Sequence, residues 1–258
     1  MISAFKLLVK KILELFDLHI FKKYDYDFGA DESLKKLFKI FNMDCNGLVI
    51  FDIGANIGQS IERFKKNFPD PYIYSFEPQP ETYSALKAKY DNDPKCHLYN
   101  LGLGSVNDKI IFYDMPDKRH GSFIKFNPKG APSHTYTMGL KNPLGINNEI
   151  LVDVTTINKF CANKNITNID ILKIDTQGYE VEVLKGGLDV LQNVRAIELE
   201  VMFSDLYPDH STLGEISSIL ESCGFILWDI PVLKKYKTKK INRVNYCDII
   251  FVNAKYLN

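Results

Sequence analysis

The 258-residue chain lacks an excess of charge of either sign, since 32 lysine and arginine residues balance 32 aspartate and glutamate residues. Without a general positive field it has no electrostatic reason to bind a polyanion, and we expect no nucleic-acid partner. It also lacks internal repeats and low-complexity tracts, and 45% of its residues are hydrophobic. This composition excludes a disordered, collagen-like or coiled-coil chain and is typical of one large globular domain with or without appendages.

Cysteine is scarce, and its spacing is not that of a disulfide or metal motif. The five cysteines are an odd number, lie far apart, and form no C-x-x-C or mixed cysteine and histidine pattern. A disulfide framework and a structural zinc site are therefore not expected. We interpret these residues as free thiols in a reducing cytoplasm. They are Cys45, Cys96, Cys161, Cys223 and Cys247.

A long apolar run is missing as well. Residues 1–24 are rich in apolar residues and lysine, but Lys10 and Lys11 interrupt them well before the ~20 apolar residues of a membrane span. Lysines inside the apolar stretch, with no small-residue cleavage site after it, also argue against a signal peptide. The pattern predicts an amphipathic helix with five lysines against two acids, within a helical extension over residues 1–46. This helix either docks on the protein's own core or contacts an anionic membrane surface or a partner.

From residue 48 onward, short β-rich runs alternate with helical segments, which is the pattern of a mostly parallel sheet covered by helices. We therefore predict an α/β domain over residues 47–258. Its seven strands are expected at 48–53, 72–76, 97–101, 169–174, 194–200, 225–230 and 247–252. Its helices are expected at 58–67, 80–90, 179–184, 188–191 and 212–223.

A long insertion is expected at residues 114–149. The segments on either side of it, 109–113 and 150–155, alternate like strands of a hairpin or a sheet extension. A connection longer than about 15 residues inside a compact domain is usually functional or disordered. We interpret residues 114–149 as a segment that covers the substrate, with a passive loop as the alternative.

The most informative stretch is VIFDIGANIGQS at residues 49–60, where an apolar strand runs into glycines and then a helix. Gly54 permits a positive φ and a close ligand, while Gly58 lets the helix pack on the strand. A dinucleotide fold has G-x-G-x-x-G here, whereas this chain has D-x-G-x-x-x-G beginning at Asp52. A carboxylate there repels a pyrophosphate and suits a cationic ligand such as S-adenosylmethionine. We expect Asn56, within the same turn, to contact this cofactor.

A second cofactor contact is expected where the second strand ends in SFEP, at residues 75–78. An acidic residue at this strand tip can accept hydrogen bonds from both ribose hydroxyls, in NAD sites and in methyl-donor sites alike. Glu77 therefore indicates a ribose, with Pro78 beside it. Asn100 and Leu101, at the end of the third strand, are expected to border the adenine. A helix cap and a surface acid are the alternative structural roles for Asp52 and Glu77.

Five blocks, taken in order, resemble the FkbM family of S-adenosylmethionine-dependent methyltransferases over roughly residues 48–253. They are FDIGANIGQS at 51–60, SFEPQP at 75–80, NLGLG at 100–104, LKIDTQGYEVEVLKG at 172–186 and IELEVMFSDLY at 197–207. The resemblance implies a class I methyltransferase fold, with seven strands ordered 3-2-1-4-5-7-6 and the last one antiparallel. It also implies methyl transfer, usually to a hydroxyl oxygen and often on sugars or other secondary metabolites. Where the family often reads Asp-Val-Glu-Gly, this chain has Gln177 in place of the glutamate.

The fourth and fifth strands should end next to the reacting methyl group, because ligands lie beyond the carboxyl ends of strands in an open α/β sheet. A hydroxyl must lose its proton to a base or be activated by a metal, and Asp175 is the first candidate for either role. Asp175 and Glu200 form a candidate Mg²⁺ pair, whereas strand alternation is expected to turn Glu198 away. A structural role stays open, with Asp175 capping the helix near Gly178 and Glu200 paired to a lysine.

Histidine is the other residue type that can serve as the base. His120 in the insertion and His210 after the fifth strand are the candidates. We therefore predict a cytoplasmic S-adenosylmethionine-dependent O-methyltransferase that acts on a hydroxyl of a small molecule, with a sugar or glycan intermediate as the expected acceptor. A glycan assembled at the inner membrane face would explain the basic N-terminal helix and the lysine-rich loop at 234–240. The alternatives are an NAD-dependent oxidoreductase and a non-catalytic scaffold of the same fold.

Overall fold

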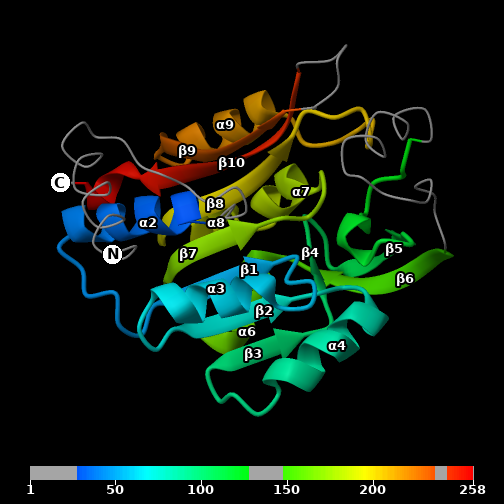
Figure 1. Ribbon diagram of the computed structural model, residues 1–258, viewed down its shortest axis with the longest axis horizontal. Coiled ribbons are helices and arrows are strands. Elements are labelled where there is room, and N and C mark those ends of the chain that lie inside the picture. The colour runs from blue at the N-terminus through cyan, green and yellow to red at the C-terminus, as the bar shows by residue number, and fades with distance from the viewer. Residues whose placement is uncertain (1–27, 128–147, 236–242, 258) are drawn as a thin grey trace, which may run out of the picture.

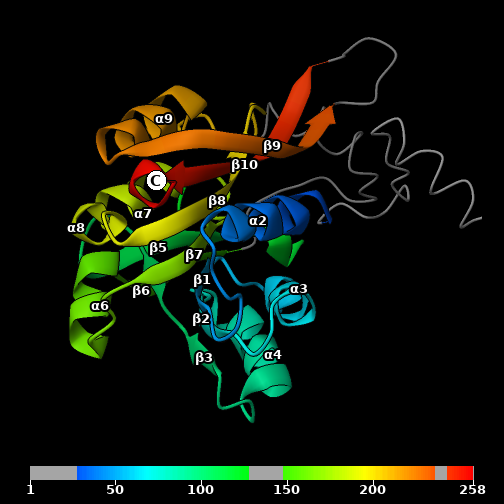
Figure 2. The same cartoon turned by 90° about the vertical axis from the view of Figure 1, so that its left-hand side faces the viewer.

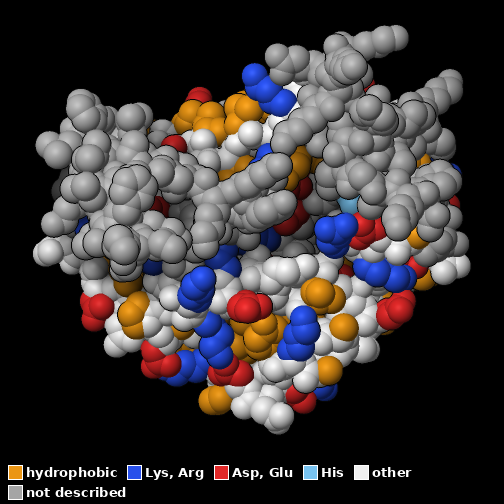
Figure 3. Space-filling view, viewed as in Figure 1, with side chains coloured by type: hydrophobic (Ala, Val, Ile, Leu, Met, Phe, Trp, Pro, Cys, Tyr) orange, Lys and Arg blue, Asp and Glu red, His pale blue; other side chains and the backbone are white. Residues whose placement is uncertain are grey.

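The computed structural model describes residues 28–127, 148–235 and 243–257. The predicted helix in residues 1–24, most of the insertion at 114–149 and most of the lysine-rich loop lie outside these ranges. No helix in the described ranges is long and apolar enough to cross a membrane. On the face shown in Figure 3, basic and acidic side chains of the described surface are interspersed, in keeping with the balanced charge.

The main sheet of the described chain has seven strands. These are β1 (Val49–Ile53), β2 (Tyr72–Phe76), β3 (Cys96–Tyr99), β7 (Ile169–Ile174), β8 (Val194–Met202), β9 (Phe225–Lys235) and β10 (Val244–Asn253). Their order is β3-β2-β1-β7-β8-β10-β9 (Figure 1). Counted along the chain this is 3-2-1-4-5-7-6. The last strand, β10, is antiparallel to both of its neighbours, so the predicted topology is confirmed.

Helices cover both faces of this sheet. The central strand β7, with the sequence IDILKI, is therefore buried at every position instead of alternating between buried and exposed residues. Figure 2 shows α2, α3 and α4 on one side and α6, α7, α8 and α9 on the other. One core therefore joins the first group to Ile50 and Ile171, and the other joins the second group to Phe51 and Leu172. The helices are α2 (Phe28–Ile40), α3 (Gln59–Asn67), α4 (Pro80–Tyr90), α6 (Ile157–Lys164), α7 (Glu180–Lys185), α8 (Leu188–Leu191) and α9 (Leu213–Ser222).

A second sheet in the described chain extends the domain beside the carboxyl ends of the main strands (Figure 1). It contains β4 (Gly102–Leu103), β5 (Asp108–Asp114) and β6 (Asn148–Thr155), in the order β4-β6-β5. The strands β5 and β6 pair antiparallel along their length, which confirms the predicted sheet extension. This sheet brings both ends of the insertion to the rim of the main sheet.

Two helices had no specific prediction. The helix α2 packs beside β9, and a Cβ on its Gly29 would lie 2.9 Å from the Pro231 carbonyl oxygen. The helix α6 is only eight residues long, but its ends carry recognisable signals. The Thr156 side chain accepts a hydrogen bond from the Lys159 amide, and Asn165 ends the helix with φ of 54°. These residue types are preferred at helix caps for that reason.

Candidate active site

A cavity of about 310 Å³ opens where β1, β2, β7 and β8 end at their carboxyl edge. Its lining joins two groups of residues that are far apart in the sequence. One group comes from the turn after β1 and the end of β2, and the other from the ends of β7 and β8 and the first half of the antiparallel strand β10. The described residues at the start of the insertion, including His120 and Phe123, form another wall. The site is therefore located where the open-sheet rule predicts it.

The turn after β1 requires glycine at two positions. Gly54 has φ of 83°, and a Cβ there would lie 1.9 Å from the Asp175 carbonyl oxygen, so no side chain fits. Gly54 lines the cavity, as predicted. Gly58 has φ of 92°, and a Cβ there would lie 2.3 Å from the Tyr90 ring. Its role is therefore close packing of α3 against α4 rather than against the strand.

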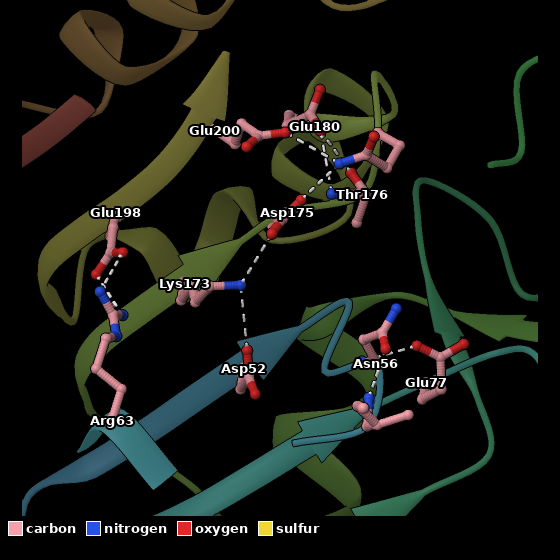
Figure 4. Close-up of polar contacts among 12 residues, drawn as sticks. Asp52, Asn56, Arg63, Glu77, Lys173, Asp175, Thr176, Glu180, Glu198 and Glu200 are labelled. Carbon is pink, nitrogen blue, oxygen red and sulfur yellow. Dashed lines mark hydrogen bonds and ion pairs between the residues drawn. The ribbon is translucent and has the colours of Figure 1, made fainter. Parts of the chain in front are cut away.

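Glu77 is the acid at the tip of β2 and is held in place by backbone amides. Its two carboxylate oxygens accept hydrogen bonds from the Asn56 and Gln79 amides, each at 2.9 Å. Burial raises the pKa of Glu77 to about 7, against the opposing effect of these two amides. Asn56 has φ of 49°, which turns its amide toward the carboxylate. Figure 4 shows the contact between Asn56 and Glu77. Both residues line the cavity.

The remaining predicted cofactor residues divide into two groups. Pro78 and Leu101 line the cavity next to Glu77. Asn100 is not among the described lining residues. Its side-chain amide nitrogen instead donates to the backbone carbonyl oxygens of Glu77 and Pro78, each at 2.9 Å. Asn100 therefore braces the loop that carries Glu77.

Asp52 lies beneath the cavity rather than in its wall. It is fully buried, and the Lys173 ammonium lies 3.4 Å from one of its oxygens. Burial raises the pKa of Asp52, while Lys173 and Arg63 act in the opposite direction. In the sheet register, Asp52 is beside Lys173 and Lys173 is beside Glu198, so opposite charges alternate across three strands.

Arg63 of α3 completes this charged row and was not among the predicted site residues. Its guanidinium donates to both oxygens of Glu198, at 2.8 and 2.9 Å. The expectation that Glu198 turns away from the site was wrong. Residues two positions apart on a strand point to the same face, and both Glu198 and Glu200 line the cavity. Periodicity alone gave no signal that a helix arginine would reach across to β8.

Asp175 and Glu200 come together as predicted, but an amide lies between them (Figure 4). The Gln177 side-chain nitrogen donates to one oxygen of each, at 3.0 Å in both cases. The Lys173 ammonium is 3.4 Å from the other Asp175 oxygen. Burial and then the neighbouring Asp175 charge raise the pKa of Glu200 well above its usual range.

The structural roles considered for these two acids are not the ones observed. Glu180, rather than Asp175, accepts hydrogen bonds from the Thr176 and Gly178 amides at the start of α7. Glu200 interacts with an amide rather than with a lysine. For metal binding, the described residues contain no group of three or more His, Cys, Asp or Glu side chains arranged around one ion. A hydrogen-bond donor between the two carboxylates is the wrong chemistry for Mg²⁺, which takes oxygen ligands.

The two histidines differ in position. His120 is buried and lines the cavity, with Nδ1 3.5 Å from Asp117. Burial lowers the pKa of His120, and Asp117 opposes this shift. His210 is not among the described residues of the cavity wall. Its Nδ1 donates to the Tyr207 carbonyl oxygen at 2.6 Å, and its Cβ packs against Gly178.

The strand order with its antiparallel last strand, the glycine turn after β1 and the acid at the tip of β2 define a class I methyltransferase. Residues 52–227 match the model of the methyltransferase FkbM domain. The chain therefore belongs to the FkbM methyltransferase family, and it is an S-adenosylmethionine-dependent methyltransferase. Family membership excludes the NAD-dependent oxidoreductase alternative.

Several characterised proteins are similar in sequence. The 2-O-methyltransferase NoeI of Sinorhizobium fredii is 26% identical over 180 residues, covering 67% of this chain and 71% of the relative. The hexuronic acid methyltransferase AglP of Haloferax volcanii is 29% identical over 156 residues, covering 59% and 55%. Among solved structures, magnesium protoporphyrin IX methyltransferase of Synechocystis PCC 6803 superposes with a TM-score of 0.45 at 10% identity, covering 96% and 99% of the two chains.

Proposed function

We propose that this protein transfers a methyl group from S-adenosylmethionine to a hydroxyl oxygen of a sugar or glycan intermediate. The observation that carries the proposal is one cavity whose lining includes both Glu77, the acid at the tip of β2, and Asp175, the carboxylate that follows β7. Relatives described as a 2-O-methyltransferase and a hexuronic acid methyltransferase support the choice of oxygen and of carbohydrate.

The residues around Glu77 fit the adenosine part of the cofactor. Two backbone amides fix the Glu77 carboxylate in one orientation, and each oxygen keeps further lone pairs for ribose hydroxyls. The bare backbone at Gly54 lets a ligand approach closely. Pro78 and Leu101 offer apolar surface beside this acid, which suits the adenine ring. We therefore assign cofactor binding to Gly54, Asn56, Glu77, Pro78 and Leu101.

Asp175 is proposed as the general base. The cofactor supplies a methyl group on a positively charged sulfur, which leaves as a thioether when the acceptor oxygen forms its new bond to carbon. The acceptor hydroxyl must lose its proton during this step, and Asp175 can accept it. The Lys173 ammonium lies 3.4 Å from one Asp175 oxygen and helps to hold the carboxyl group at the cavity wall. His120, which also lines the cavity, is the second candidate base, whereas His210 is not retained because it is not among the described lining residues.

Much of the rate enhancement is expected from holding the reactants in line. Positioning of this kind is worth roughly 7–11 kcal/mol in well-oriented reactions. The insertion begins at this wall, and its described segment is anchored to the site by Ser122, whose hydroxyl donates to the Gln177 carbonyl oxygen at 2.9 Å. We propose that this segment contributes the acceptor-facing wall.

A labelled-cofactor assay tests the proposal. The purified protein is incubated with S-adenosylmethionine carrying a deuterated methyl group and a panel of glycosides, uronosides and sugar nucleotides. The account predicts release of S-adenosylhomocysteine together with a product that carries the label as a methyl ether. Labelling of nitrogen or carbon acceptors in parallel reactions, with none on the sugars, would contradict it.

A further inference from the structure

The Gln177 carboxamide occupies the space between two acids at the reacting end of the cavity. Its nitrogen is 3.0 Å from an oxygen of Asp175 and 3.0 Å from an oxygen of Glu200. Both N–H bonds of the amide are therefore used, one on each carboxyl group. The reverse orientation of the amide would point its oxygen at two acceptor groups, so the observed orientation is the one that hydrogen bonding selects.

The backbone holds Gln177 in this place at a conformational cost. Its φ is 55°, in the left-handed region that residues other than glycine seldom adopt. Contacts on both sides fix the conformation. The Ser122 hydroxyl donates to the Gln177 carbonyl oxygen, and Glu180 accepts the amides of Thr176 and Gly178 on either side. The loop is thus built to present this side chain to the two acids.

This arrangement conflicts with a divalent cation at the same point. A cation bound between Asp175 and Glu200 would meet the positive end of the Gln177 amide dipole, since the amide presents N–H groups rather than an oxygen. Mg²⁺ and Mn²⁺ are bound by oxygen ligands, and affinity rises with the number of charged ligands. The neutral amide therefore supplies the hydrogen bonds that the two carboxyl groups need and leaves no ligand set for a metal.

We propose that Gln177 is a positioning residue that holds Asp175 and Glu200 in register as a metal-free pair at the acceptor end of the cavity. This inference rests on the proposed function, because it assigns the pair to the methyl-transfer site. It makes a specific prediction: replacing the amide with a carboxylate turns the same three positions into a divalent-cation site. The Gln177→Glu change keeps the size of the side chain and alters only its chemistry.

Mn²⁺ binding to the full chain tests the proposal, measured by calorimetry and by the loss of the free-ion electron paramagnetic resonance signal. Four proteins are compared: wild type, Gln177→Glu, the double variant Gln177→Glu with Glu200→Gln, and Gln59→Glu. Gln59 also lines the cavity but lies on α3, so its variant adds the same charge away from the pair. S-adenosylhomocysteine binding and the melting temperature of each protein are measured beside it.

We expect Gln177→Glu to bind one Mn²⁺ at least about tenfold more tightly than the wild type, because a third carboxylate joins the two in place. The double variant and Gln59→Glu should bind no better than the wild type. A folded Gln177→Glu protein that binds Mn²⁺ no more tightly than the wild type would overturn the proposal.

If Gln177→Glu fails to fold, Gln177→Ala provides the second test. It removes the donor and should give a weaker gain in Mn²⁺ affinity that disappears on adding Glu200→Gln; no gain would refute the role of the amide. The proposed function fails separately. Wild-type protein that does not bind S-adenosylhomocysteine would contradict that function whatever the metal results.

Discussion

Replacing Glu77 with alanine is expected to weaken binding of S-adenosylhomocysteine without unfolding the protein. In the structure, two backbone amides hold this carboxylate at the cavity wall. A hydrogen bond to a charged group contributes about 1.5–3 kcal/mol, which corresponds to roughly a 10- to 150-fold rise in the dissociation constant. Titration calorimetry at pH 8 measures this change. Glu62→Ala, which removes an exposed acid from α3, is the matched control and should bind as the wild type does.

The pH dependence of the same binding gives a second readout. The pKa of Glu77 is about 7 in the ligand-free protein, and the ionised form is the better acceptor for ribose hydroxyls. Wild-type affinity is therefore expected to fall about tenfold from pH 8 to pH 6, since roughly nine-tenths of the carboxyl groups are protonated at the lower pH. The Glu77→Ala variant lacks this group and should show a much flatter profile.

The pH dependence of stability has the opposite sign. Because burial raises the Glu77 pKa from 4.5 to about 7, its contribution to folding is fully present below pH 4.5 and is lost as the pH rises through 7. The difference corresponds to about 3 kcal/mol. Urea denaturation of the ligand-free proteins should therefore shift in favour of Glu77→Ala between pH 5 and pH 8. Two binding results would refute the assignment of Glu77 to the ribose. One is an unchanged S-adenosylhomocysteine affinity of Glu77→Ala at pH 8, and the other is the same pH dependence of that affinity in both proteins.

Three further predictions concern the reacting acid, the turn and the buried ion pair. Asp175→Asn should abolish turnover and keep S-adenosylhomocysteine affinity; normal turnover in the labelled-methyl assay would exclude it as the base. Gly54→Ala should cost about 3 kcal/mol in urea denaturation, because a Cβ meets a backbone oxygen at 1.9 Å. At Gly214 in α9 the nearest atom to a Cβ is Thr212 Oγ1 at 4.0 Å, so Gly214→Ala should stabilise the protein by up to about 1 kcal/mol. Equal effects of the two changes would contradict the tight turn. Arg63→Met should destabilise by about 3–5 kcal/mol by leaving Glu198 buried without its cation. Adding Glu198→Met should recover most of that loss, and a double variant less stable than the single one would argue against the pairing.

The main sheet could be predicted almost completely from the sequence. Buried parallel strands such as Ile169–Ile174 are rich in isoleucine and leucine, and Pro80 fixes the start of α4 at the predicted residue. The helix α6 had no prediction because it is short and weakly amphipathic, so that its caps at Thr156 and Asn165 were the better signal. Tertiary packing, rather than local preference, decides such elements.

The site was predictable in its residue types and less so in its contacts. Glycine spacing and the acid at the tip of β2 predicted residues that line the cavity, because those features depend on local backbone geometry. The bridge through Gln177 and the pair between Arg63 and Glu198 join segments 23 and 135 residues apart. Only the assembled sheet brings such side chains together. It also places Asp52, predicted as a cofactor contact, beneath the described lining of the cavity.

Binding of S-adenosylhomocysteine and NAD to the purified chain, titrated in parallel in the presence of a chelator, tests the central claim most directly. The account predicts micromolar binding of S-adenosylhomocysteine and no saturable binding of NAD, with the same affinity after Mg²⁺ is added. Saturable binding of NAD alone, or of neither ligand, would contradict the cofactor assignment of this cavity.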